Sequence, residues 1–314
     1  MPRPEPRTAP YDHLRGRIAA FGSCRVGVRR RAWARHVGVA LTVMISAARV
    51  AVADEQALSA KARLAEDFND PLTTVPQIFL KDVYTPENFG INGQANRLIA
   101  RMLIPRVPRI SFFPDQLIRP TFQLVTLPTG PHKGTRTEFG DIELFDLGVI
   151  PWPSRETGFY MGVGPLFVFP TATSPAAGQN AWQVGPAFGA VYKGIPGLLF
   201  GALIQNPISF AYTSSRHQPV NALLVQPIVL AYVGHGFYIK SGDSTWGVGW
   251  RPRSATTLPL SFGIGYVLLR ETWPVINVFV SGEWMAYRQF APVAPQTSVN
   301  FGFSLAFPNL RPWD

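Results

Sequence analysis

The stretch Val299-Asn300-Phe301-Gly302-Phe303-Ser304-Leu305-Ala306-Phe307, near the end of the chain, alternates more regularly than any other. Its odd-numbered residues are large and apolar, and its even-numbered residues are small or polar. Successive side chains of a β-strand point to opposite faces, so a period of two predicts a strand with one wholly apolar face.

Other parts of the chain divide in the same way. Large apolar residues alternate with Gly, Ser, Thr, Asn, Gln and charged residues in 118–127, 159–164, 260–268 and 275–287. Val267 and Phe279 are exceptions, because each is a large apolar residue on the small and polar face. Clusters of Pro, Gly, Ser and Thr separate these segments, as expected of turns between strands.

The length of the segments decides which solvent surrounds the strands. A strand in a soluble protein averages about five or six residues, whereas a tilted strand that crosses a membrane needs roughly 9 to 11. In a membrane barrel, large apolar side chains meet lipid, small or charged ones line the interior, and closure pairs every backbone N–H and C=O group. The sequence therefore predicts an all-β fold, a transmembrane antiparallel up-and-down β-barrel.

We place the barrel within 74–310, followed by a periplasmic tail at 311–314. The expected strands, about twelve, lie near 74–84, 95–105, 117–127, 138–149, 158–168, 182–192, 198–208, 220–232, 236–247, 257–268, 274–287 and 297–307. An even number fits a bacterial single-chain barrel with both ends in the periplasm. The strand near 138–149 has no clear outer face, because Asp141 and Glu143 share one parity with Phe139 and Phe145.

The first 53 residues resemble a signal peptide behind a basic leader. Four arginines, Arg29, Arg30, Arg31 and Arg35, precede an apolar run at 37–48, and Ala51-Val52-Ala53 then precedes Asp54. A charged start, a short apolar core and small residues before the cut are typical of a secretory signal. The following segment, 54–73, is expected to be a short periplasmic N-terminal segment; one hypothesis is a short helix that plugs or gates the barrel, and the alternative is a disordered leader.

Charge and residue chemistry exclude several functions. The chain carries 29 basic and 19 acidic residues, but ten arginines and two acids lie in the first 53, which leaves 19 basic and 17 acidic residues, or +2. This balance does not indicate nucleic-acid binding. The only cysteine, Cys24, lies in the leader, and His132, His217 and His235 are far apart, so we expect no metal and no cofactor. We expect no catalytic residues, although Ser214, Ser215 and His217 lie close together in one loop.

Function is then sought among polar residues on the face opposite the large apolar ones. The candidates expected to face the barrel interior are Arg119, Gln123, Asn277, Ser281 and Glu283. A charge on the lipid face near the membrane midplane costs about 2 to 4 kcal/mol for Arg or Lys, so the interior tolerates it better. Such residues either select solutes in an open passage or form ion pairs that fill a closed interior, and parity alone leaves both alternatives open.

An ordered series of short motifs, spread over 69–310, resembles one known family. The motifs include Gly162-Val163-Gly164-Pro165, Pro170-Thr171-Ala172-Thr173, Trp182-Gln183-Val184-Gly185-Pro186, Asn69-Asp70-Pro71-Leu72 and Leu305-Ala306-Phe307-Pro308. They are similar to those of the outer-membrane barrel transporters called phenol-degradation MetA-pathway proteins, although the chain departs from that pattern at Arg119 and Pro120. The resemblance implies a barrel in the outer membrane of a Gram-negative bacterium and uptake of small, often aromatic or hydrophobic, molecules.

Three functional hypotheses follow. The first is a porin-like channel for passive passage of small, hydrophobic or aromatic compounds; the second is a structural or interaction barrel with a filled interior; the third is an outer-membrane lipid hydrolase. The first makes the protein a non-enzyme. The expected partners are outer-membrane lipids, a small-molecule solute and, through the C-terminal strand, the barrel assembly machinery.

Overall fold

The computed structural model describes residues 60–91, 93–106, 115–129, 134–154, 157–215, 217, 219–268, 274–308 and 310. The predicted signal peptide and its cleavage point, the start of the segment 54–73, and the tail 311–314 lie outside the described residues.

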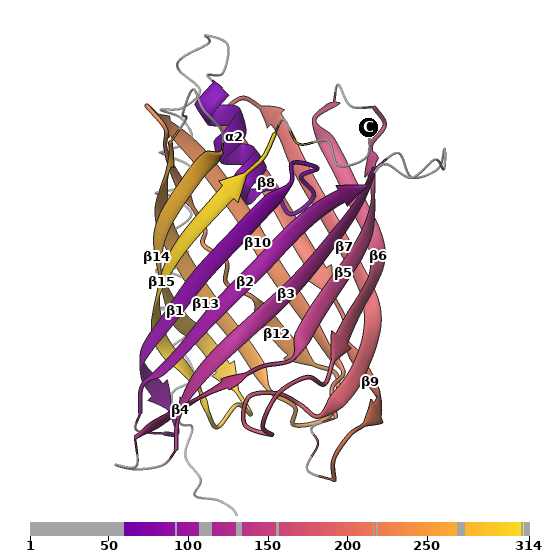
Figure 1. Ribbon diagram of the computed structural model, residues 1–314, viewed down its shortest axis with the longest axis vertical. Helices are drawn as coiled ribbons and strands as arrows, with labels where there is room; N and C mark the ends of the chain where they lie inside the picture. The colour runs from indigo at the N-terminus through magenta and orange to yellow at the C-terminus, as the bar shows by residue number, and fades with distance from the viewer. Residues whose placement is uncertain are drawn as a thin grey trace, which may run out of the picture. The chain divides into compact units, whose positions relative to one another are not determined.

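The described chain forms one sheet that closes on itself, together with one short helix (Figure 1). The helix is α2 (Ala60–Asn69). The strand segments are β1 (Gln77–Phe89), β2 (Ala95–Arg106), β3 (Asp115–Pro128), β4 (Thr135–Phe139), β5 (Ile142–Pro151), β6 (Phe159–Phe169), β7 (Ala181–Ile195), β8 (Leu198–Gln205), β9 (Ile208–Tyr212), β10 (Ala222–Gly234), β11 (Phe237–Lys240), β12 (Trp246–Gly249), β13 (Thr256–Leu268), β14 (Val275–Gln289) and β15 (Ala294–Ala306).

Closure of the sheet depends on the pairing of the first strand with the last. β1 pairs antiparallel with β15, with Gln77 opposite Ala306, and all other neighbouring strands also pair antiparallel. The fifteen segments make twelve strands, because β4 with β5, β8 with β9, and β11 with β12 are each parts of one interrupted strand. The predicted all-β antiparallel barrel of twelve strands is confirmed.

One interruption explains why the strand near 138–149 has no clear outer face in the sequence. β4 and β5 both pair with β3, but Gly140 and Asp141 lie between them. The break changes the parity, so Glu138 is buried in β4, whereas Phe145 is buried in β5 and Phe139 is exposed. The Asp141 carboxylate turns away from the ladder to accept hydrogen bonds from the backbone N–H groups of Ala172 and Gln179.

The outer face of the barrel carries the large apolar side chains. Along β14 and β15 the exposed residues are Val278, Val280, Trp284, Val299, Phe301 and Phe303, and the residues between them, Asn277, Ser281, Asn300 and Ser304, are buried. This outward and inward division follows the sequence alternation. No helix among the described residues is long and apolar enough to cross a membrane.

The sequence predicts small and polar residues on the inner face of the barrel. At one end of the barrel the inner face is apolar instead. We call the end that holds Gln77 and Ala306 the α2 mouth, and the opposite end the far mouth. Towards the α2 mouth the inner wall carries an apolar collar of Leu117, Phe145, Leu147, Val191, Leu199, Leu203, Leu230, Val267 and Val275. Val267 breaks the alternation of β13 because it belongs to this collar.

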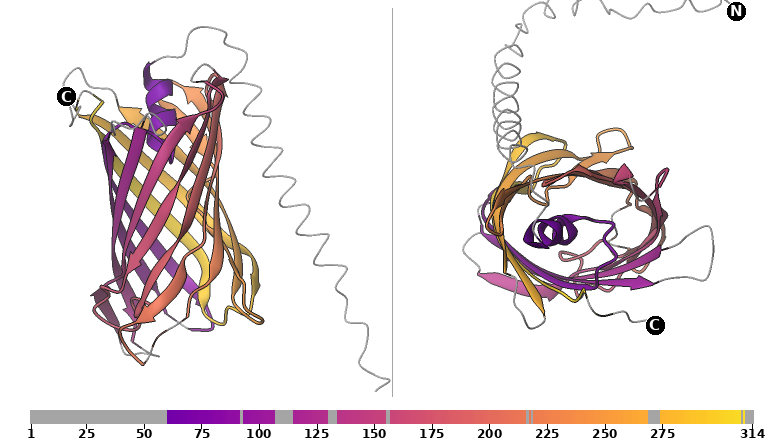
Figure 2. Two further views of the ribbon diagram at one scale, coloured as in Figure 1. Left: turned by 90° about the vertical axis from the view of Figure 1, so that its right-hand side faces the viewer. Right: turned by 90° about the horizontal axis from the view of Figure 1, so that it is seen from above.

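The collar buries one face of α2, which lies inside the ring of strands when the barrel is viewed from above (Figure 2). Ala65 and Phe68 of α2, and Leu72 just after it, belong to the same buried cluster as the collar. Full burial of a Leu or Phe side chain stabilises by about 1.5 to 3 kcal/mol, so these contacts hold the segment in place. Gly162 and Gly189 make room for it, since a Cβ at either glycine would lie within 3.0 Å of Leu72 Cδ2.

Candidate functional site

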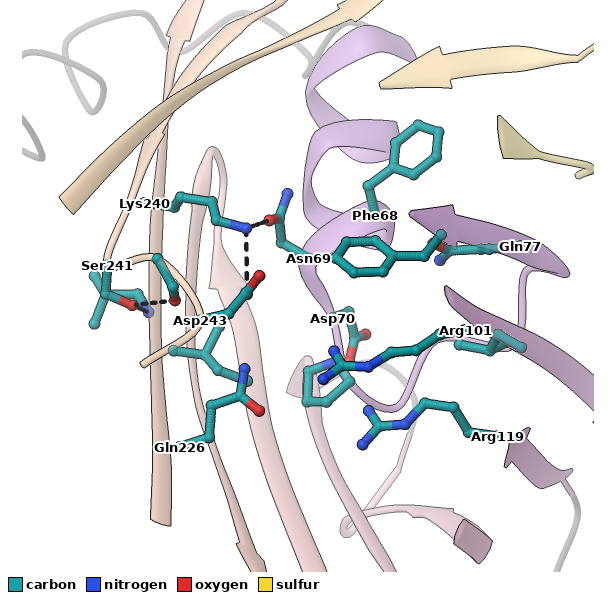
Figure 3. A pocket seen from close by; sticks show the side chains of 16 residues that line it. Phe68, Asn69, Asp70, Gln77, Arg101, Arg119, Gln226, Lys240, Ser241 and Asp243 are labelled. Atoms are coloured by element: carbon teal, nitrogen blue, oxygen red, sulfur yellow. Dashed lines mark hydrogen bonds and ion pairs between the residues drawn. The ribbon is translucent and has the colours of Figure 1, made fainter. Parts of the chain in front are cut away.

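Four basic side chains gather in the barrel beneath α2, and we call them the basic cluster: Lys81, Arg101, Arg119 and Lys240. They come from β1, β2 and β3, which follow one another along the chain, and from β11, which lies far later in the sequence. Closure of the barrel brings β1, β2 and β3 to one side of the interior and β11 to another, as the close view shows for Arg101, Arg119 and Lys240 (Figure 3).

One carboxylate enters this cluster through a break in a strand. Between β11 and β12 the chain leaves the sheet at Ser241, and Gly242 adopts a positive φ of 72° that favours glycine. Asp243 follows directly. Its Oδ1 lies 3.3 Å from Lys240 Nζ, and its Oδ2 lies 3.5 Å from Lys81 Nζ. The excursion therefore supplies one negative charge to two lysines.

The excursion is held firmly by hydrogen bonds to neighbouring strands. The Ser241 backbone N–H donates to the Val229 carbonyl oxygen at 2.8 Å, and the Val229 N–H donates to Ser241 Oγ at 3.1 Å. The hydroxyl groups of Ser244 and Ser261 lie 2.5 Å apart. Asp243 is thus placed by backbone and serine contacts and not by its ion pairs alone.

The two arginines of the cluster are packed differently from the lysines. Arg101 Cζ lies 5.4 Å from the centroid of the Phe79 ring, and Arg119 Cζ lies 4.4 Å from that of Phe145. Both Nε atoms are buried, and neither has a hydrogen-bond partner among the described residues. Each guanidinium group is therefore supported by an aromatic ring, while a donor at its edge is unused.

Two aromatic rings of the inner wall also contact the cluster. Phe79 and Phe279 stack with their centroids 6.0 Å apart, and Lys240 Nζ lies 3.8 Å from the Phe279 centroid. Phe279 thus breaks the alternation of β14 because it faces inward and supports a buried lysine. A cation over an aromatic face is attracted by the ring quadrupole.

α2 and the residues after it close the cluster on the side of the α2 mouth. Lys240 Nζ donates to Asn69 Oδ1 at 2.9 Å. Lys193 Nζ of β7 lies 2.7 Å from Asp70 Oδ2 and 3.3 Å from Asp67 Oδ1. The Gly197 backbone N–H donates to Glu66 Oε1 at 3.2 Å. The N-terminal segment is therefore joined to the barrel by charge as well as by the apolar collar.

Burial changes the acidity of α2. It raises the pKa of Glu66 to about 7, while Lys193 and the Gly197 N–H act in the opposite direction. Burial likewise raises the pKa of Asp67, against the opposing charge of Lys193. We therefore expect docking of the helix to depend on pH.

Of the residues proposed from parity, only Arg119 belongs to the basic cluster. Gln123 Nε2 donates to the Asp141 carbonyl oxygen at 3.1 Å and so braces the break between β4 and β5. Asn277 is 1% exposed and its Oδ1 accepts from Tyr238 Oη at 2.8 Å. Ser281 is 2% exposed and accepts from Asn300 Nδ2 at 3.1 Å.

Glu283, the remaining residue proposed from parity, is half-buried on β14, opposite Ser261 of β13 and Ser298 of β15. It interacts electrostatically with Lys81 and Arg97. Asn277 and Ser281 belong to the hydrogen-bonded inner wall and Glu283 lies nearer the far mouth, so the structure does not bring these residues together with Arg119.

Sequence reasoning missed Lys81, Arg101, Lys240 and Asp243. Parity could have found the first two, because Lys81 alternates with Ile78 and Leu80, and Arg101 alternates with Leu98 and Met102, all exposed on the outer face. Asp243 gave no such signal. Its neighbours Ser241, Gly242 and Ser244 are typical of a turn, and only the pairing of β11 and β12 with the same neighbours shows that the turn interrupts a strand.

The loop considered for hydrolysis is organised in another way. His217 Nδ1 lies 3.0 Å from the carbonyl oxygen of Ser214, and its ring stacks on Tyr212 at 3.8 Å between centroids. The His217 ring therefore contacts the backbone of Ser214. A serine nucleophile would require a contact between the histidine and a serine hydroxyl instead. His132 lies outside the described residues, and the described part of the chain holds no group of three or more His, Cys, Asp or Glu placed to bind a metal.

No protein-family model matches the chain, and no curated protein matches it. Solved structures do. The chain resembles the COG4313 outer membrane channel from Pseudomonas putida F1, with a TM-score of 0.53, 14% identity, and coverage of 76% of this chain and 98% of that one.

Two further solved structures are less similar. The KdgM porin has a TM-score of 0.45 at 9% identity, covering 74% of this chain and 99% of that one. The NanC porin has a TM-score of 0.46 at 11% identity, covering 73% and 98%. At these identities the likeness concerns the fold alone, and the resemblance to MetA-pathway proteins stays a prediction. The protein is a closed antiparallel β-barrel of the fold that the Pseudomonas putida channel also has.

Proposed function

We propose that the protein is a passive channel in the outer membrane of a Gram-negative bacterium. The observation that carries the proposal is the opposite character of the two faces of a closed barrel: Val278, Phe301 and Phe303 are exposed outside, whereas Asn277, Ser281 and Asn300 are buried inside. An exposed apolar band matches lipid, and closure leaves no strand edge unpaired in a medium without water. Lipids are therefore its solvent, and β15 is the segment that barrel assembly machinery would bind.

The solutes that fit are small and partly hydrophobic or aromatic. Phe68, Phe79, Leu103 and Ile228 line the cavity next to the basic cluster. Apolar rings and charged groups side by side suit a small molecule with an aromatic or aliphatic body and a polar group. The MetA-pathway resemblance points to the same solute class. Gln123, Asn277, Ser281 and Glu283 would act as the polar wall of this passage.

The N-terminal segment would restrict the passage at one mouth. α2 occupies the ring of strands in Figure 2 and is held by the ion pairs of Lys193 and by the apolar collar. We place this mouth in the periplasm, so that α2 is a periplasmic plug or gate.

Single-channel recording tests the channel proposal. We expect the mature chain, refolded into a planar bilayer, to give discrete open steps that aromatic solutes reduce. A control barrel denatured before addition should give none. A heat-modifiable, folded barrel without any current would contradict the channel.

A structural barrel with a filled interior is the second candidate. It is favoured by the apolar collar, which packs against Ala65, Phe68 and Leu72 and fills the interior around α2. The same recording separates the two functions, because an intact barrel filled by α2 and the apolar collar gives no open steps, whereas a channel does.

A further inference from the structure

We infer that Arg101 and Arg119 form a binding site for the carboxylate of a small organic anion inside the barrel. This inference rests on the proposed channel and names its substrate class. The site would hold the anion next to the apolar rings of the cavity. It would therefore favour carboxylates with a hydrophobic body over neutral molecules of the same shape.

The position of the two arginines brings their guanidinium groups into one cavity. Arg101 lies on β2, opposite Thr121 of β3, and Arg119 lies two residues earlier on β3, so that both side chains face the interior. Both line the cavity between α2, Asp243 and the inner wall. Figure 3 shows the two side chains extending in the same direction, from the wall opposite Lys240.

The two acidic residues that line this cavity already form ion pairs with lysines. Asp70 and Asp243 line it, but Asp70 Oδ2 lies 2.7 Å from Lys193 Nζ, and Asp243 lies within 3.5 Å of both Lys81 and Lys240. Among the described residues, Arg101 and Arg119 form no ion pair of that length. They also repel each other, while Glu143 and Asp243 attract Arg119 from beyond ion-pair distance. An anion bound between the two arginines would offset the repulsion further.

The geometry of the arginines suits a carboxylate. Arg101 lies over the ring of Phe79 and Arg119 over that of Phe145, so each guanidinium already has a cation–π contact. The hydrogen-bond donors at the guanidinium edges are the groups that can bind a solute. The buried Nε of each arginine has no partner within the described part of the chain. A planar guanidinium donates two parallel hydrogen bonds to a carboxylate, a contact that a neutral amide cannot match.

The apolar side of the cavity selects the body of the anion. Phe68, Phe79, Leu103 and Ile228 line the same space as the arginines. Transfer of an aromatic or aliphatic body from water to this wall is favourable. The combined arrangement fits a small aromatic or branched carboxylate better than an inorganic anion.

Binding of benzoate, with benzamide as the neutral probe of equal size, tests the inference. Isothermal titration of the intact mature protein in detergent should show benzoate binding at least roughly tenfold tighter than benzamide. Arg101→Gln and Arg119→Gln should each weaken benzoate binding by roughly tenfold, and Arg119→Lys, which keeps the charge without the planar fork, should weaken it less. Arg251→Gln, on an exposed loop, loses the same charge outside the site and should leave binding unchanged.

Equal binding of benzoate and benzamide would overturn the site, as would equal losses in Arg101→Gln and Arg251→Gln. Heat-modifiable migration on a gel confirms that each variant is folded. If Arg119→Gln does not fold, Arg119→Lys and the comparison of the two probes still decide. Titration needs no open pore, so arginine-dependent benzoate binding without conductance supports the site and contradicts the channel. Conductance without a preference for benzoate over benzamide supports the channel and contradicts the site.

Discussion

Asp243 sets the balance of charge in the barrel interior, because it is the carboxylate that Lys81 and Lys240 share. Asp243→Asn removes that negative charge and leaves the basic cluster more positive. We expect the variant to conduct anions over cations more strongly than the wild type, measured as the reversal potential in a salt gradient. We also expect a lower unfolding temperature, since two buried lysines lose their partner.

Asp82→Asn is a matched control for Asp243→Asn. Asp82 lies on β1 opposite the outward-facing Leu98 and Phe301, and its Oδ1 accepts from Asn96 Nδ2 at 2.9 Å. Loss of its charge lies outside the passage and should not change the reversal potential. An equal shift in both variants would show that the effect comes from net charge and not from the interior.

The candidate site was only partly predictable at the level of single residues. The alternation of β3 predicts that Arg119 faces the interior. It does not predict which strands lie opposite Arg119 across the barrel. Phe279 illustrates the limit, since its inward position makes sense only with Lys240 and Phe79 beside it. Such contacts join residues far apart in the chain, and no local pattern contains them.

At the level of elements, the sequence predicted regular strands and failed at interruptions. All twelve expected strands overlap observed ones, because the apolar alternation has the period of the pleat itself. Gly140-Asp141 and the excursion around Asp243 were not foreseen. In both places the backbone leaves the ladder and its groups bond elsewhere, as when Ala172 and Gln179 donate to Asp141.

Docking of α2 should depend on pH through Glu66. Its pKa is raised to about 7 in the docked helix against the ordinary 4.5, so the docked state holds the proton more strongly and docking strengthens as pH falls between these values. Asp67, whose pKa burial also raises, acts in the same direction, and the positive charge of Lys193 opposes both. Above about pH 7 and below the ordinary pKa of 4.5, Glu66 has the same protonation state in the docked and undocked helix, so its contribution to the free energy of docking does not change with pH.

If α2 narrows the passage, conductance should be lower at about pH 5 than at about pH 8. Glu66→Gln keeps the oxygen that accepts from the Gly197 N–H but does not titrate, so its conductance should be low at both values, with a smaller change between them. Deletion of 54–70 should give high conductance throughout. An unchanged pH response in Glu66→Gln would show that another group controls the passage, and a deletion without effect would contradict the plug.

At the scale of the whole molecule, the two mouths differ in a way that predicts orientation. The α2 mouth has the tight turns Pro196-Gly197 and His235-Gly236 beside the longer connections 107–114 and 152–158, whereas the far mouth has the two longest connections, 170–180 and 213–221. Outer-membrane barrels have short periplasmic turns and longer extracellular loops. The far mouth should therefore face the outside of the cell.

Labelling of single cysteines tests this orientation. Ala176, in the connection 170–180, and Ser154, in the connection at the α2 mouth, are both exposed. Cys24 is the only natural cysteine and lies in the leader, so a processed chain would carry only the introduced thiol. In intact cells, a membrane-impermeant maleimide should label Ala176→Cys at once, and Ser154→Cys only after the outer membrane is opened. The reverse order would place α2 at the cell surface, where it would meet solutes before the basic cluster does and act as an outer lid instead of a periplasmic gate.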